Sequence, residues 1–157
     1  MVLSKEKLFI ADPYNDTHIK AIINFEKENN IEKKISEELE RIKSSTPRKQ
    51  YIENVENSND LSLYIYLEEE NKIKDGCFIQ GVKDIKKCKI VFAPIHTLSR
   101  KKMIRLVEKY AFKILGMEEV FLEVDQRDKT TITYLESRYE NLGEDNEKIL
   151  FLKEKKK

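Results

Sequence analysis

Three consecutive cations stand where a long helix is expected to begin. Arg100, Lys101 and Lys102 follow Ser99, whose hydroxyl can cap that helix. Positive charge at a helix N-terminus is unfavourable by about a few tenths of a kcal/mol per residue, and a bound anion would remove that cost. These residues therefore predict an anion site, with Ser99 lending a hydroxyl group. The alternative is that the three cations form the solvated first turn of a lysine-rich helix.

A histidine precedes those cations by four residues. Histidine is the side chain best suited to moving a proton at physiological pH, and His96 is better placed for this role than His18. The alternative is that His96 is a solvated loop residue. Cys77 and Cys88 lack zinc-ligand spacing and are too few for a disulfide scaffold, so we expect two reduced thiols in the core. The sequence contains no metal-binding cluster, phosphate-binding glycine loop or Ser/His/Asp set.

The elements that must position these residues follow from the periodicity of apolar positions. The helix after Ser99 ends at Gly116, which supplies a left-handed stop. Its apolar face comprises Met103, Leu106, Val107, Tyr110, Ala111 and Ile114. Residues 61–67 alternate with the period of a strand. Further strands are predicted at residues 8–10, 76–82, 88–92, 120–124, 142–143 and 149–152. Further helices are predicted at residues 16–25, 31–42, 47–55 and 129–138.

The order of these elements predicts the fold class. Short charged connectors at 68–75 and 83–87 favour an antiparallel meander. If the strands on either side of the second connector pair symmetrically about it, Cys77 and Cys88 lie near opposite each other. Strands interspersed with helices indicate the α+β class, a mixed sheet with helices packed on it. We expect one domain over residues 1–153 and a frayed basic tail at 154–157.

Composition limits the classes of function. The 157 residues include 30 Lys and Arg against 29 Asp and Glu, which gives a net charge of +1. Near-neutrality argues against a nucleic-acid or membrane-surface binder. The sequence has no apolar run long enough to cross a bilayer and no apolar leader, so we expect a cytoplasmic protein. Glycine occurs only four times in the 157 residues, a share well under the average of roughly 7% in proteins.

Three stretches of the chain resemble the GNAT superfamily of acyl-CoA N-acyltransferases. Residues 90–94 (IVFAP) are similar to its fourth strand, 120–124 (VFLEV) to its fifth, and 128–139 (DKTTITYLESRY) to the helix that follows. The resemblance extends over about residues 8–153. It implies a central, mostly antiparallel twisted sheet flanked by helices. It also implies transfer of an acetyl or acyl group from acyl-CoA to an amine of a small molecule or peptide.

The resemblance also assigns roles to individual residues. It implies that the pantetheine arm of acetyl-CoA lies along the end of the fourth strand, and that the pyrophosphate binds where the next helix begins. The residues implied to bind the co-substrate are Phe92, Ala93, Pro94, Ser99, Arg100, Lys101, Lys102 and Asp128. Tyr134 is the candidate for protonating the leaving thiolate, and His96 is the candidate for the general base.

Two departures from the family pattern leave an alternative open. Residues 95–103 contain no glycine, although the family places glycines there so that phosphates can approach the backbone. The family's tyrosine position is occupied by Leu135, one residue after Tyr134, and Asp128 replaces an asparagine. The alternative is a catalytically inactive GNAT-like domain that acts as a binding or scaffolding module. Monomer and homodimer both remain open.

Overall fold

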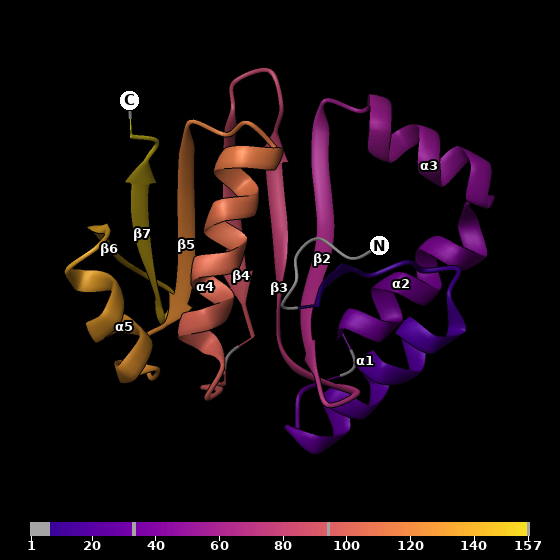
Figure 1. The fold of residues 1–157 in the computed structure, drawn as a ribbon, viewed down its shortest axis with the longest axis horizontal. Coiled ribbons are helices and arrows are strands. Elements are labelled where there is room, and N and C mark those ends of the chain that lie inside the picture. Colours follow the sequence, from indigo (N-terminus) through magenta and orange to yellow (C-terminus); the bar gives the residue numbers. More distant parts are fainter. Residues whose placement is uncertain (1–6, 33, 94, 157) are drawn as a thin grey trace.

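The computed structural model describes residues 7–32, 34–93 and 95–156 and contains one seven-stranded sheet of order β1-β2-β3-β4-β5-β7-β6 (Figure 1). Every neighbouring pair is antiparallel except β4 and β5, which are parallel. The strands are β1 (Leu8–Ile10), β2 (Asp60–Glu69), β3 (Lys72–Val82), β4 (Lys87–Phe92), β5 (Glu119–Asp125), β6 (Glu140–Asp145) and β7 (Lys148–Glu154).

Helices lie on both sides of this sheet. Figure 1 shows α4 and α5 on the β4–β7 side, whereas α1, α2 and α3 gather beside β2. The helices are α1 (Asp16–Glu28), α2 (Lys34–Ser45), α3 (Arg48–Asn57), α4 (Arg100–Lys109) with the π-helical turn η1 (Tyr110–Ile114), and α5 (Lys129–Glu136). The expected α+β class, with a mostly antiparallel sheet flanked by helices, is therefore confirmed.

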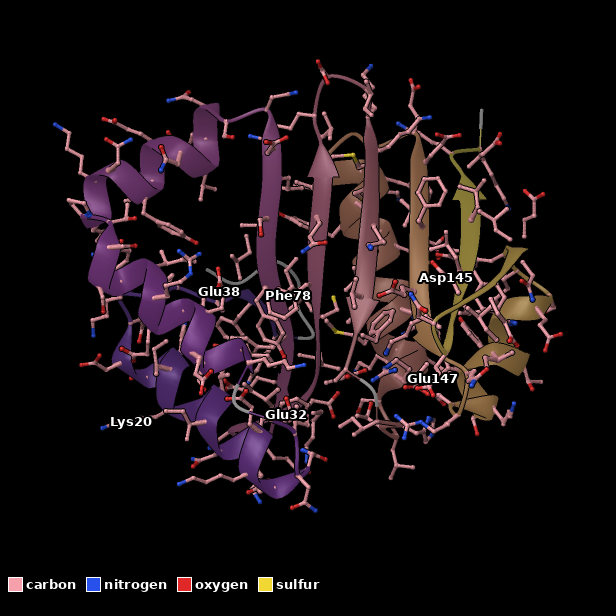
Figure 2. The ribbon with its side chains drawn as sticks, turned by 180° about the vertical axis from the view of Figure 1, so that it is seen from behind. Lys20, Glu32, Glu38, Phe78, Asp145 and Glu147 are labelled. Atoms are coloured by element: carbon pink, nitrogen blue, oxygen red, sulfur yellow. The ribbon has the colours of Figure 1, made fainter. Side chains whose placement is uncertain are left out.

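Alternating residues of the strands form two separate cores. In β2, Leu63 and Ile65 belong to the core under α4, whereas Tyr64 and Tyr66 belong to the core under α1 and α2. Figure 2 shows Phe78 of β3 on the side of these two helices. This division follows from the two-residue period of a strand, which sends successive side chains to opposite faces. Phe78 of β3 joins the second core and contacts Tyr64 edge to face.

Three details of the sequence prediction are wrong. The β2–β3 connector is only the turn Glu70–Asn71, with φ of 54° and 62°, so β3 begins at Lys72. Such left-handed two-residue turns match the twist of a hairpin, and here neither residue is the glycine that usually signals them. Ile114 is 70% exposed, because the i→i+5 bond from Leu115 N–H to Tyr110 O widens the last turn and rotates it off the apolar face.

The third error concerns the cysteines. Val82 pairs with Lys87 across the β3–β4 turn, and counting outward places Cys88 opposite Gly81 and Cys77 opposite Phe92. Cys77 and Cys88 are therefore not cross-strand neighbours. Both thiols are free and buried, and burial raises the pKa of Cys88 to about 12. Gly116 stops the helix in the expected left-handed conformation, with φ of 68°.

Glu154 and Lys155, which were expected to belong to a frayed tail, are paired to the sheet. β7 extends through Glu154, and the Lys155 N–H donates to Glu118 O at 2.8 Å.

The parallel ladder between β4 and β5 is short, and this creates the place where a site can form. Its last pair is Val91 with Glu123, and beyond it β4 ends at Phe92 while β5 continues to Asp125. Each strand then leads to a helix, α4 or α5, at the same edge of the sheet (Figure 1). Side chains from the starts of both helices therefore meet at the carboxyl ends of β4 and β5.

Gly76→Ala is expected to destabilise the protein by about 1–3 kcal/mol, the usual cost of overpacking a core. An added Cβ would lie 2.6 Å from Cζ of Tyr64 and closer still to its hydroxyl oxygen, and the ring is held in the core by Phe78. The free energy of unfolding in urea measures the loss. Tyr64→Phe is the control: its buried hydroxyl has no hydrogen-bond partner among the described residues, so stability should hardly change. Equal stability of Gly76→Ala and the wild type would contradict this packing.

His18 gives a pH-dependent prediction. Its Nδ1 accepts the Asp12 N–H at 3.0 Å, and its ring lies edge-on to Phe9 and Tyr66. Burial lowers the pKa of His18 below its ordinary value of about 6.5. The unfolded chain therefore binds the proton more readily, and the contribution of His18 to stability is present above about pH 6.5 and lost as the pH falls through the lowered pKa.

The His18→Gln variant tests this sign. We expect urea unfolding to show a smaller loss of stability between pH 7 and pH 5.5 in the variant than in the wild type. The same pH dependence in both proteins would contradict the prediction.

Candidate functional site

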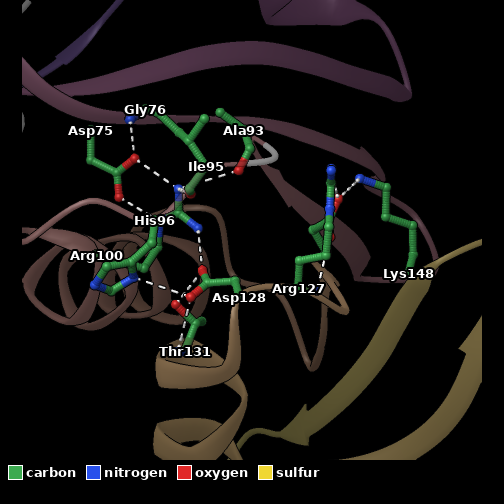
Figure 3. Close-up of polar contacts among 11 residues, drawn as sticks. Asp75, Gly76, Ala93, Ile95, His96, Arg100, Arg127, Asp128, Thr131 and Lys148 are labelled. Atoms are coloured by element: carbon green, nitrogen blue, oxygen red, sulfur yellow. Dashed lines mark hydrogen bonds and ion pairs between the residues drawn. The ribbon is translucent and has the colours of Figure 1, made fainter. Parts of the chain in front are cut away.

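A fully buried arginine occupies the carboxyl ends of β4 and β5. Arg100, the first residue of α4, is 1% exposed and lies between two buried carboxylates, Asp75 of β3 and Asp128, the N-cap of α5 (Figure 3). We call Asp75, Arg100 and Asp128, together with His96 and Thr131, the Arg100 cluster. The cluster joins segments that are far apart in the sequence. It lies just beyond Val91 and Glu123, the last pair of the ladder between β4 and β5.

Asp75 holds the guanidinium with both of its oxygens. Arg100 Nε donates to Oδ2 at 2.7 Å, and Nη2 donates to Oδ1 at 3.2 Å. Oδ1 also accepts the Gly76 N–H at 2.9 Å. This two-point contact fixes the plane of the guanidinium, which a single point charge such as a lysine could not do.

Asp128 connects Arg100 to a histidine. Its Oδ2 accepts from Arg100 Nη1 at 3.3 Å and from the Thr131 hydroxyl at 2.6 Å. Its Oδ1 accepts the Thr131 N–H at 3.2 Å and lies 3.1 Å from His96 Nδ1. The His96 side chain is 39% exposed, so the histidine is the member of the cluster that solvent or a substrate can reach.

The segment after β4 adds backbone contacts to Arg100. Its Nη2 donates to Ile95 O at 2.9 Å and to Ala93 O at 3.4 Å, and its guanidinium lies 4.6 Å from the centroid of the Phe92 ring. Phe92 and Ala93, which the resemblance assigns to pantetheine, therefore contact Arg100. Pro94, assigned to the same role, lies outside the described residues.

The expected anion site at the start of α4 divides into two parts. Arg100 is buried and its donors are used by protein acceptors, so it does not face solvent as a phosphate ligand would. Lys101 is exposed, and Lys102 pairs with Glu69 at 2.6 Å. Ser99 is the N-cap, but its side chain makes no capping bond. Among the described residues the Lys101 and Lys102 N–H groups have no acceptor, as is usual in the first turn of a helix.

Tyr134 is on α5 beside this first turn. Lys101 Nζ lies 5.6 Å and the Arg138 guanidinium 4.2 Å from the centroid of its ring. The structure thus brings together the predicted residues Lys101 and Tyr134, and separately His96, Arg100 and Asp128. Leu135, at the family's tyrosine position, is fully buried.

Three residues of this region were not predicted. Asp75 was placed in a connector, whereas β3 starts earlier and carries it into the sheet. Thr131 supports Asp128, and Thr97 brings a buried hydroxyl with no partner among the described residues to the start of α4. A signal for Arg100 was available: it precedes the buried Met103 and Val107 by three and seven residues, which continues the apolar face of the helix.

The turn from β5 to α5 is stabilised by another carboxylate. Asp125 accepts the N–H and the guanidinium of Arg127, each at 2.9 Å, and lies 3.5 Å from Lys148 Nζ. The hydrogen bonds from Arg127 hold the pKa of Asp125 well below its usual range. Asp128 N–H donates to Asp125 O at 3.0 Å, so this turn helps to place Asp128.

The Arg100 cluster has a definite chemical capacity. Its two carboxylates and one guanidinium carry a net charge of −1 when His96 is neutral. A proton arriving on His96 would make the cluster neutral while Asp128 accepts its hydrogen bond. A histidine held by a buried carboxylate is the arrangement that general-base catalysis uses.

Arg100→Met is expected to destabilise the protein by about 3–5 kcal/mol, because Asp75 and Asp128 would stay buried without a counter-ion. Urea unfolding at neutral pH measures the change. Lys101→Met, at the exposed neighbouring position, is the control and should remain within about 0.5 kcal/mol of the wild type. If both variants were equally stable, the two ion pairs would not support the fold.

In the described part of the chain, no helix is long and apolar enough to cross a membrane. No group of three or more His, Cys, Asp or Glu side chains there could hold a metal ion.

Comparison with known proteins gives matches in structure but not in sequence. No family model and no curated protein matches the chain. The N-acetyltransferase PseH of Campylobacter jejuni superposes with a TM-score of 0.62 at 16% identity, covering 96% of this chain and 98% of PseH. Its complex with acetyl coenzyme A gives 0.63 at 15% identity, covering 95% and 99%.

Two other solved structures are similar over nearly the whole chain. FdhC, described as a nucleotide-linked sugar GNAT, has a TM-score of 0.60 at 19% identity, covering 94% of this chain and 85% of its own. The N-acetyltransferase PaiA of Thermoplasma acidophilum, in complex with coenzyme A, has 0.54 at 15% identity, covering 94% and 99%. With the parallel β4–β5 pair and the helices that follow it, these matches show that the chain has the fold of the GNAT acetyltransferases.

Proposed function

We propose that the protein is an acetyl-CoA-dependent N-acetyltransferase that acts on an amine of a small molecule or peptide. The observation that carries the proposal is the His96–Asp128 contact at the carboxyl ends of β4 and β5, within a GNAT fold. We infer acetyl-CoA as the co-substrate because two of the similar structures are complexes, one with acetyl-CoA and one with CoA. The net charge of +1 makes nucleic acid an unfavourable partner. We further propose a cytoplasmic, single-domain protein, monomeric or homodimeric.

The start of α4 is the proposed site for the pyrophosphate. The Lys101 and Lys102 N–H groups lack acceptors among the described residues, and both side chains are cations. Unpaired N–H groups and the positive end of the helix dipole favour an anion here without any glycine. Ser99 can donate a further hydrogen bond, and so can Thr97, whose hydroxyl has no partner among the described residues. Arg100 is left out of this site because it is buried and paired.

The proposed reaction forms a C–N bond and breaks the C–S bond of the thioester that acetyl-CoA supplies. His96 takes the proton that the attacking amine loses, and Asp128 stabilises the resulting imidazolium. Tyr134 is proposed to give its proton to the leaving thiolate and to recover one from solvent.

A second candidate function rests on the position of Arg100. Its guanidinium lies where the resemblance places the pantetheine arm and contacts Ala93 O, a backbone acceptor that pantetheine would use. Residues 95–103 also lack glycine. These observations favour an inactive GNAT-like domain that binds or scaffolds another molecule. The hydrogen bond to Ala93 O is the longest that Arg100 makes, at 3.4 Å. If a ligand replaced Arg100 there, Asp75 and Asp128 would still hold the guanidinium.

Calorimetry and thermal unfolding with acetyl-CoA and with CoA separate the two functions. We expect binding, and at 100 times the dissociation constant a stabilisation of about 2.7 kcal/mol. Lys101→Glu should weaken CoA binding about tenfold, or about 1.4 kcal/mol. Lys109→Glu, at the exposed far end of the same helix, should leave it unchanged. No binding at millimolar CoA would rule out the acetyltransferase, whereas equal weakening by both variants would move the anion site elsewhere.

A further inference from the structure

We propose that Arg100 and Asp75 are positioning residues: through Asp128 they hold His96 in the one tautomer that can accept a proton. This inference rests on the proposed function. It concerns two buried ionised groups, of which Asp75 contacts Arg100 and Arg100 also reaches Ala93 O at the edge of the proposed acetyl-CoA site.

The tautomer of His96 follows from its partner. An ionised carboxylate can only accept hydrogen bonds, so at the 3.1 Å contact with Asp128 Oδ1 the donor must be His96 Nδ1. The other ring nitrogen, Nε2, then carries the lone pair. Because the ring is 39% exposed, that lone pair is the part of the cluster available to an incoming amine.

Asp128 can impose this tautomer only while its own orientation is fixed. Thr131 donates to both oxygens, which fixes the carboxylate on the α5 side. Arg100 Nη1 donates from the opposite element, α4, at 3.3 Å. The tautomer depends on an ionised Asp128, since a protonated carboxyl group could donate to His96 and reverse it.

Arg100 is in turn fixed by Asp75. The two-point contact with Asp75 and the bond to Ile95 O use the Nε and Nη2 donors, which leaves Nη1 aimed at Asp128. A lysine would keep the positive charge but could not make this fork. Arg100→Lys therefore separates the geometric role of Arg100 from its charge.

The protein contains only two histidines, which makes the tautomer measurable. His18 Nδ1 accepts the Asp12 N–H, so a neutral His18 carries its proton on Nε2, opposite to His96. In protein labelled with ¹⁵N-histidine, long-range ¹H–¹⁵N spectra above pH 7.5 should show one ring of each tautomer. His18 thus serves as an internal reference for folding in every variant.

We expect Arg100→Lys to leave the His18 signals unchanged and to convert His96 into a mixture of tautomers. Arg105→Lys, at an exposed position on the same helix, is the matched control and should change neither ring. An unmixed Nδ1–H tautomer of His96 in Arg100→Lys would overturn the proposal. If Arg100→Lys does not fold, the wild-type spectrum still decides, because an Nε2–H tautomer of His96 there would also overturn it.

Kinetics distinguish this inference from the proposed function. With acetyl-CoA and an accepted amine, Arg100→Lys should lower kcat about tenfold or more while the KM for acetyl-CoA changes less than about twofold. An unchanged kcat would overturn the positioning role in a working enzyme. An increase in that KM alone would also overturn it, since Arg100 would then serve binding. Absence of CoA binding in the wild type would instead refute the acetyltransferase. The tautomer of His96 is measured without any ligand, so that result would still test the positioning roles of Arg100 and Asp75.

Discussion

The ion pairs of Arg100 with Asp75 and Asp128 are the constraint on which this end of the molecule depends. A guanidinium and two carboxylates lie out of water, and each carries a desolvation cost that only dense hydrogen bonding offsets. The donors and acceptors come from β3, the segment after β4, α4 and the N-cap of α5. The cluster therefore determines how the two strands that part at this edge sit relative to the helices that follow them.

That constraint also changes how a GNAT fold can be used here. The gap beyond the last β4–β5 pair contains protein charge, so a ligand entering it must compete with Arg100 for Ala93 O. The same charge gives His96 a carboxylate partner. Structure and proposed chemistry are thus coupled through one side chain. Of the other two cations at the start of α4, Lys101 stays exposed, whereas Lys102 pairs with Glu69.

Much of the fold was predictable from the sequence, but the core of the site was not. The alternation along β2 and the helix that ends at Gly116 are local patterns, and both were confirmed. Asp75 was missed because the left-handed turn at Glu70–Asn71 contains no glycine to mark it. Arg100 was expected at the surface, because it was grouped with Lys101 and Lys102 either as an anion site or as the solvated first turn of a helix. The direction of its side chain depends on the phase of α4 and on two carboxylates distant in sequence.

The separation of those carboxylates has a consequence for the rates of folding and unfolding. Asp75 and Asp128 lie 25 and 28 residues from Arg100, so the cluster forms only after two sizeable loops have closed. Contacts that form after the folding transition state leave the folding rate almost unchanged and slow unfolding instead. If the three charges pair after that transition state, they contribute little to the folding rate of the sheet. They would instead slow the unfolding of the β4–β5 edge.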